Sequence, residues 1–155
     1  MPDWTRWLLL SILIVIIDQA SKFEIVSLLA DKGEIVVAPV FSLVLLYNKG
    51  AAFSMLNDAS GWQRGFFIAI ALAASLFILH LLRKHRKEML FSFALSMVLG
   101  GALGNLVDRI RIGHVVDFLD FHLANHHFPA FNLADSAITL GAALLILDSM
   151  KKGKS

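Results

Sequence analysis

Long apolar runs alternate with short polar segments along the whole chain. The first run begins at Trp7, and because a membrane-spanning helix needs about 20 residues, it continues through Asp18 and Lys22 to Leu28 or Leu29. Three later runs have similar lengths and are bounded by polar or charged residues. We therefore predict four transmembrane helices, at about 7–29, 62–82, 88–107 and 133–150.

The segment after the first run has a different pattern. It is rich in β-branched and aromatic side chains and is interrupted by Pro39, which predicts two short strands at 35–38 and 41–47. Asn48-Lys49-Gly50 is typical of a turn, so Asn48 has a plain structural explanation as a turn residue.

Two further segments connect the expected spans. We predict that residues 51–56 form a short interfacial helix lying on the bilayer and that residues 57–61 form a loop. Residues 110–131 are rich in His and Phe, and we expect a loop there with one strand near 115–119.

Composition agrees with a membrane protein. The chain is 57% hydrophobic and 17% charged, whereas soluble domains average about 45–50% and about 25%. The mean hydropathy is +0.72. We predict an all-α integral membrane protein, one domain over 1–155, with four transmembrane helices, a small extracytoplasmic β-sheet and the short interfacial helix. The absence of cysteine excludes disulfides and thiolate chemistry.

Basic residues predict the orientation. The cluster 83–87 lies between two apolar runs, which is typical of a topology signal and not of nucleic-acid binding. This cluster and the basic tail at 151–154 should both be cytoplasmic, and with four spans the N-terminus with Arg6 falls on the same side. The loops 30–61 and 108–132 then lie outside, and each carries one more acid than base.

Two aspartates in the outer part of the chain are the leading catalytic candidates. Asp117 is the polar gap in an apolar segment, and Asp135 follows 18 residues later. A carboxylate in apolar surroundings is costly to ionise. Asp135 also has a structural explanation, because Asn132 is a good N-cap and an acid three residues later complements the helix dipole. Together the two acids predict a pair that shares one proton, with one acting as general base on water and the other as general acid.

Other polar residues in the expected spans have two explanations each. Asp18 and Lys22 are spaced i, i+4, which suits a simple ion pair. Ionisable groups inside a membrane are also functional candidates, so we predict that this pair supports the site by bonding strand or loop backbone. Asn105, Asp108 and Arg109 share one helix face, although Arg109 alone is compatible with a surface anchor.

Two other chemistries have weaker support. His122, His126 and His127 form a cluster that suggests metal binding, but no full ligand set accompanies them, so interfacial polar residues are the preferred interpretation. A serine nucleophile at Ser54 with Lys49 lacks the G-x-S-x-G pattern.

Two other classes of protein remain open at this point. A small transporter or channel subunit would use the acids to line a polar path, but such a path should place acids near the middle of several helices, and these acids gather toward one end. A non-catalytic assembly protein would not depend on the aspartates.

Five segments, in order along the chain, resemble the bacterial lipoprotein signal peptidases, also called signal peptidases of type II. Each segment is weak alone, but together they are specific. They are Asp18–Lys22, Tyr47–Phe53, Gly100–Arg109, Gly113–Phe118 and Phe131–Ser136.

This resemblance implies an aspartic endopeptidase of the bacterial inner membrane with its active site on the outer face. It would remove signal peptides from diacylglyceryl-modified prolipoproteins, cutting on the N-terminal side of the lipidated cysteine. Its partners would be these substrates and membrane lipids, not nucleic acid, and we expect a monomer without metal or cofactor. The resemblance makes Asp117 and Asp135 the catalytic pair. The supporting residues would be Asp18, Lys22, Asn48, Asn105, Asp108, Arg109 and Asn132.

Overall fold

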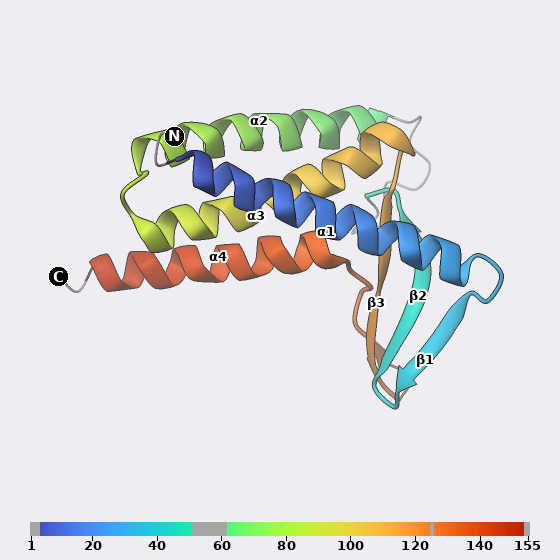
Figure 1. Ribbon diagram of the computed structural model, residues 1–155. Coiled ribbons are helices and arrows are strands. Elements are labelled where there is room, and N and C mark those ends of the chain that lie inside the picture. The colour runs from blue at the N-terminus through green and yellow to red at the C-terminus, as the bar shows by residue number, and fades with distance from the viewer. Residues whose placement is uncertain (1–3, 51–61, 125, 154–155) are drawn as a thin grey trace.

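The computed structural model describes residues 4–50, 62–124 and 126–153. Within these residues, four helices run side by side and a small sheet extends from one end of them (Figure 1). The helices are α1 Thr5–Leu29, α2 Trp62–Lys84, α3 Met89–Arg111 and α4 Leu133–Lys152. The first turn of α1 and the last turn of α4 lie at the end of the bundle opposite the sheet.

Three of these helices, α2, α3 and α4, are long and apolar enough to cross a membrane, counted over the described parts of the chain. The helix α1 has sufficient length, with 25 residues, but carries Asp18, Lys22 and Glu24 in its second half. α3 is central, since it contacts each of the other helices. The fold is therefore mostly helical with three candidate spans, and the status of α1 depends on where its charges lie.

Glycines allow α3 to approach α1 and α4 closely. A Cβ on Gly100 would lie 2.7 Å from the Cβ of Ile14 in α1, and one on Gly101 would lie 2.3 Å from the carbonyl oxygen of Ala134 in α4. Such distances leave no room for a side chain on either glycine. The backbone of α3 therefore packs directly against α1 and α4, as expected for small residues between membrane helices.

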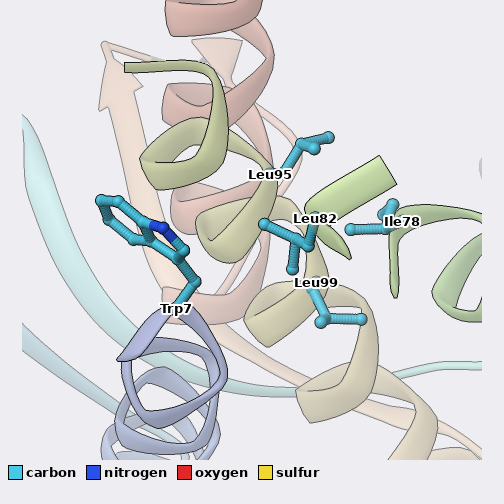
Figure 2. Close-up of a cluster of buried hydrophobic side chains, with 5 residues drawn as sticks. All are labelled: Trp7, Ile78, Leu82, Leu95 and Leu99. Carbon is cyan, nitrogen blue, oxygen red and sulfur yellow. The ribbon is translucent and has the colours of Figure 1, made fainter. Parts of the chain in front are cut away.

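A hydrophobic cluster joins α1, α2 and α3 away from the sheet. Trp7, Ile78, Leu82, Leu95 and Leu99 are all buried, and Figure 2 shows these side chains between the helix ribbons. A second cluster joins the other end of α1 to the sheet, where Ile25 and Leu29 pack against Phe118. The sheet is thus held on the end of α1.

The sheet has the antiparallel strand order β1-β2-β3-β4. The strands β1 and β2 confirm the predicted pair within one residue. The expected turn after β2 is also present, since the side chain of Asn48 accepts a hydrogen bond from the backbone N–H of Gly50 at 2.8 Å. The strands are β1 Glu34–Ala38, β2 Phe41–Asn48, β3 Val115–Leu123 and β4 His126–His127.

The strand predicted near 115–119 is present as part of β3, but the loop predicted for the rest of 110–131 is partly helix and strand. The helix α3 continues to Arg111, Gly113 turns the chain with a φ of +82°, and the nine-residue strand β3 follows. Residues 115–118 of β3 are buried without alternation, so the two-residue period that marks a half-exposed strand is missing. The predicted interfacial helix at 51–56 and loop at 57–61 lie outside the described residues.

Candidate active site

One buried asparagine connects the two candidate aspartates. Asp117 lies on β3, and Asp135 lies in the first turn of α4. The side-chain nitrogen of Asn132 donates to Asp117 Oδ1 at 2.8 Å, while its oxygen accepts from the backbone N–H of Asp135 at 2.9 Å. Asn132 is completely buried. The expected N-cap is therefore present, and the same residue links the carboxylate of Asp117 to the backbone of Asp135.

Two more asparagines donate to the pair. The nitrogen of Asn48 donates to Asp117 Oδ2 at 2.9 Å, and that of Asn105 donates to Asp135 Oδ1 at 2.7 Å. The three amides come from β2, α3 and the turn before α4, so three separate elements converge on the two acids. A carboxylate accepts hydrogen bonds well and donates none, so these donors suit an ionised or half-ionised pair.

Burial changes the ionisation of Asp117. Loss of contact with water and, to a smaller extent, the nearby charge of Asp135 raise the pKa of this carboxyl, and its pKa is about 6. Hydrogen bonds from Asn48 and Asn132 and the charge of Lys22 act in the opposite direction. Asp117 therefore exchanges its proton near neutral pH, as a catalytic acid or base must.

A buried ionic cluster lies beside the pair. Lys22 Nζ is 2.8 Å from Asp18 Oδ2 and 2.8 Å from Asp108 Oδ2. Asp18 Oδ1 accepts from the backbone N–H of Ala134 at 2.9 Å, and Asp108 Oδ2 accepts from that of Val116 at 3.2 Å. The cluster thus fixes the start of α4 and the start of β3 to α1 and α3.

The structure gives Asp18 and Lys22 partners other than the predicted strand or loop backbone. Asp18 bonds the backbone N–H of Ala134 in the first turn of α4, and Lys22 bonds side chains. Sequence reasoning missed Gln19, whose side chain donates to Asp108 Oδ1 at 2.9 Å and to the carbonyl of Gly104 at 3.2 Å. The signal available was its position between Asp18 and Lys22 in the first matching segment.

Arg109 faces the site. Its guanidinium lies 5.1 Å from the ring centre of Phe67 and is attracted electrostatically to Asp135, Asp117 and Asp108, in that order. All three residues predicted on this face of α3, Asn105, Asp108 and Arg109, are therefore directed toward the polar region.

A cavity of about 480 Å³ opens next to Asp135. Its wall is mainly apolar, and the carboxylate lies in the lining together with Ser136 and Thr139 at the start of α4. A chain segment placed there would have one end at the candidate acids and an apolar surface along its length. The apolar lining residues are Phe128, Phe131, Leu140 and Ala143.

The histidine cluster lies on the sheet, away from this pair. His127 Nδ1 is 2.8 Å from Asp120 Oδ2, and His122 shares a 3.3 Å contact with Ser42 Oγ. Over the residues that the structure describes, no group of three or more His, Cys, Asp or Glu side chains is arranged to hold a metal ion. Ser54, the alternative nucleophile, lies outside the described residues.

The helices and the polar site at their end define a small integral membrane protein. A sequence profile described as signal peptidase (SPase) II matches residues 10–151. The chain is 53% identical over 146 residues to the lipoprotein signal peptidase of Burkholderia vietnamiensis (strain G4 / LMG 22486), covering 94% of this chain and 88% of that protein. It is 52% identical, with the same coverage, to the lipoprotein signal peptidase of Burkholderia multivorans (strain ATCC 17616 / 249). The chain belongs to the signal peptidase II family.

Solved structures have the same fold. A bacterial membrane enzyme determined by the in meso method superposes with a TM-score of 0.82 at 32% identity, covering 96% of this chain and 90% of that one. A second such structure gives a TM-score of 0.81 at 31% identity, covering 95% and 94%. The protein is thus a multi-pass bacterial inner-membrane peptidase of this family.

Proposed function

We propose that this protein removes signal peptides from diacylglyceryl-modified prolipoproteins, with Asp117 and Asp135 as its catalytic pair. The observation that carries the proposal is the single buried Asn132, which bonds both acids at the end of an apolar bundle. Cleavage takes place on the N-terminal side of the lipidated cysteine. We propose that the protein acts as a monomer.

The surroundings of the pair suggest different roles for the two acids. Asp135 receives the short hydrogen bond from Asn105, attracts Arg109 most strongly, and lies in the first turn of a helix, where the dipole favours negative charge. Asp117 is more deeply buried, which favours its neutral form. We therefore assign the charge to Asp135 and the shared proton to Asp117 in the resting pair.

The reaction follows from this assignment. Asp135 takes a proton from a water molecule, and the hydroxide oxygen forms a bond to the carbonyl carbon of the scissile peptide. Asp117 gives its proton to the leaving nitrogen as the carbon–nitrogen bond breaks. The water is consumed as a new carboxyl group and a new amine. The proton taken from water is then on Asp135, and its transfer to Asp117 restores the resting pair.

The cavity beside Asp135 suits the apolar part of a signal peptide. Its apolar wall extends along α4 from Asp135 to Ala143, about two helical turns. An apolar peptide lying there would place its outer end near the acids. The strands β1 and β2 are available at the same end of the bundle to bond an extended segment.

We further propose that α1 is a fourth span. The residues Leu9, Ile12, Leu13, Ile16 and Ile17 are each about half exposed and form an apolar surface suited to lipid. Its Asp18 and Lys22 are buried and paired with each other. Glu24 is exposed, but it lies in the last two turns of α1, next to the sheet end of the bundle. A paired, buried acid and base do not face hydrocarbon, so they do not prevent insertion.

Four spans place both termini in the cytoplasm and the catalytic pair on the outer face. We expect reporters fused after Lys87 and after Ser155 to indicate the cytoplasm, and a reporter fused near Asn125 to indicate the outside. A reporter after Lys87 that indicates the outside would contradict this orientation.

The proposal is tested directly with purified protein in detergent or lipid. We expect it to cleave a prolipoprotein that carries the diacylglyceryl group and to release a product whose N-terminal residue is the lipidated cysteine, as identified by mass spectrometry. The matched control is the same prolipoprotein without the lipid, which should be cleaved much more slowly. Equal cleavage of both forms would contradict the proposed substrate.

The pKa of Asp117 predicts the pH dependence. Because Asp117 must hold the shared proton, and burial raises its pKa to about 6, kcat/KM should fall as pH rises through about 6. The hydrogen bond from Asn48 favours the carboxylate, so Asn48→Ala should raise the pKa and move this decrease to higher pH. Rates measured from pH 4 to pH 9 check this, and a shift to lower pH would contradict the assignment.

A further inference from the structure

We propose that Lys22 is a positioning residue for the cleavage reaction, because its ammonium group fixes the side-chain amide of Asn105 with the NH2 group toward Asp135. The inference rests on the proposed catalytic role of Asp117 and Asp135. It assigns Lys22 a role beyond neutralising the two buried acids beside it.

All donors of Lys22 are used. Its ammonium has three hydrogens and no acceptor, and Nζ has three acceptors: Asp18 Oδ2 at 2.8 Å, Asp108 Oδ2 at 2.8 Å and Asn105 Oδ1 at 3.0 Å. The side chain is 4% exposed, so water does not replace these partners. A group that only donates requires the amide oxygen of Asn105 to face it.

This requirement sets the other end of the amide. With its oxygen toward Lys22, Asn105 presents its nitrogen to Asp135 Oδ1 at 2.7 Å. A reversed amide would place its nitrogen against the ammonium and its oxygen against the carboxylate, so that both contacts would become repulsive. The cation on α1 therefore decides which group α3 offers to the catalytic acid on α4.

Asn132 is the other group that orients Asn105, and it is the weaker of the two. Its nitrogen reaches Asn105 Oδ1 at 3.2 Å, but also the carbonyl of Val116 at 3.2 Å and Asp117 Oδ1 at 2.8 Å. Two hydrogens cannot satisfy three acceptors fully, and the carboxylate is closest. Hydrogen bonds from a charged donor are roughly twice as strong as neutral ones, so Lys22 dominates.

Asn105 differs in this respect from the other two amides of the site. The oxygens of Asn48 and Asn132 are held by backbone N–H groups close in sequence, those of Gly50 and Asp135. The oxygen of Asn105 is held by side chains alone, chiefly by one 83 residues away in sequence. A single substitution can therefore remove its orientation without changing any backbone hydrogen bond at the site.

The test is a double-mutant cycle between Lys22→Met and Asn105→Ala. Each single variant should lower kcat/KM by about 10- to 100-fold, since each removes the hydrogen bond to a charged carboxylate. If Lys22 acts through Asn105, the double variant should be no slower than Asn105→Ala alone, within about threefold. Lys32→Met, which removes one exposed charge at the same end of α1, should leave kcat/KM unchanged.

The pH profile separates positioning from simple stabilisation. If Lys22 acts through Asn105, the pH profile of kcat/KM should change in the same way in Lys22→Met and in Asn105→Ala, whereas a loss of stability alone should lower kcat/KM equally at every pH. The charged groups facing the pair are Arg109 and Asp108 on α3 and Asp18 and Lys22 on α1. Lys22→Met also removes a charge that acts on Asp117 directly. The change in pH profile that Lys22→Met causes when Asn105→Ala is already present measures this direct effect.

A second variant protects the test against unfolding, because Lys22→Met leaves two buried acids without their cation. Lys22→Met/Asp108→Asn removes one of these charges while an amide oxygen still accepts from the N–H of Val116. The double variant should have nearly the same unfolding temperature as Asp108→Asn. Its cleavage rate should still be about 10-fold or more below that of Asp108→Asn.

The inference would be overturned if the losses of kcat/KM caused by Lys22→Met and Asn105→Ala multiply in the double variant. It would also be overturned if unfolding accounts for the whole loss of activity of Lys22→Met, with and without Asp108→Asn. Failure of the proposed function would look different. In that case Asp117→Asn would still cleave the substrate, whatever the outcome of the cycle.

Discussion

Asp117→Asn and Asp135→Asn each lower the rate of prolipoprotein cleavage by about a thousandfold or more, because each removes one half of the proposed acid–base pair. General acid or base catalysis contributes about 10² to 10⁴ in rate, and two groups that act as a unit are both required. The measurement is single-turnover cleavage of the lipidated substrate by purified variants. The double variant should be little slower than either single one.

The matched control for this experiment is Asp120→Asn. Asp120 is a buried acid on the same strand, three residues after Asp117, but its carboxylate bonds His127 outside the proposed pair. We expect it to retain cleavage within a few-fold of the parent rate. Thermal unfolding should show that all the variants remain folded, and near-parental cleavage by either Asp117→Asn or Asp135→Asn would remove the basis of the mechanism.

Gly101→Val should destabilise the bundle by about 3 kcal/mol, at the upper end of the cost of overpacking. The new Cβ would lie 2.3 Å from the carbonyl oxygen of Ala134 and 2.7 Å from Cγ1 of Ile138. The first of these is backbone, which cannot rotate away, so α3 and α4 must separate. Because Ala134 precedes Asp135, cleavage should fall as well, even at temperatures where the variant remains folded.

The same substitution at Gly65 is the control for helix propensity. Gly65 lies in α2, and no other helix or strand of the described chain has an atom within 4 Å of the position of a Cβ, so Gly65→Val should change stability by less than about 1 kcal/mol. Equilibrium unfolding in mixed micelles measures both variants. Similar stabilities for the two would show that the α3–α4 contact is not limited by Gly101.

Much of the fold follows from local patterns in the sequence. The apolar runs predict the four helices because burial in lipid or between helices needs uninterrupted apolar surface. The β-branched segment around Pro39 predicts β1 and β2, and Asn132 predicts the start of α4 through its capping side chain. These signals are local, since each depends on residues within a few positions of one another.

The strand β3 shows where local patterns end. Its first four residues have no two-residue period because both faces of the strand are covered there, and its hydrogen-bonding partner β2 is about 70 residues earlier in the chain. The strand exists because that partner is present. The predicted span ended at Val107, about one turn before the end of α3 at Arg111, for a similar reason, since Asp108 is paired with Lys22 of α1 and not exposed to water.

The sequence by itself determined which residue types are available: two acids in apolar surroundings, three asparagines, and an acid–base pair within a helix. The tertiary structure decided which atoms meet. Only the packing of α1, α3, α4 and β3 places Asn132 between Asp117 and Asp135 and turns the amide oxygen of Asn105 toward Lys22 and its NH2 group toward Asp135. Hydrogen bonds are directional and act over about 3 Å, so spacing along the chain cannot specify them.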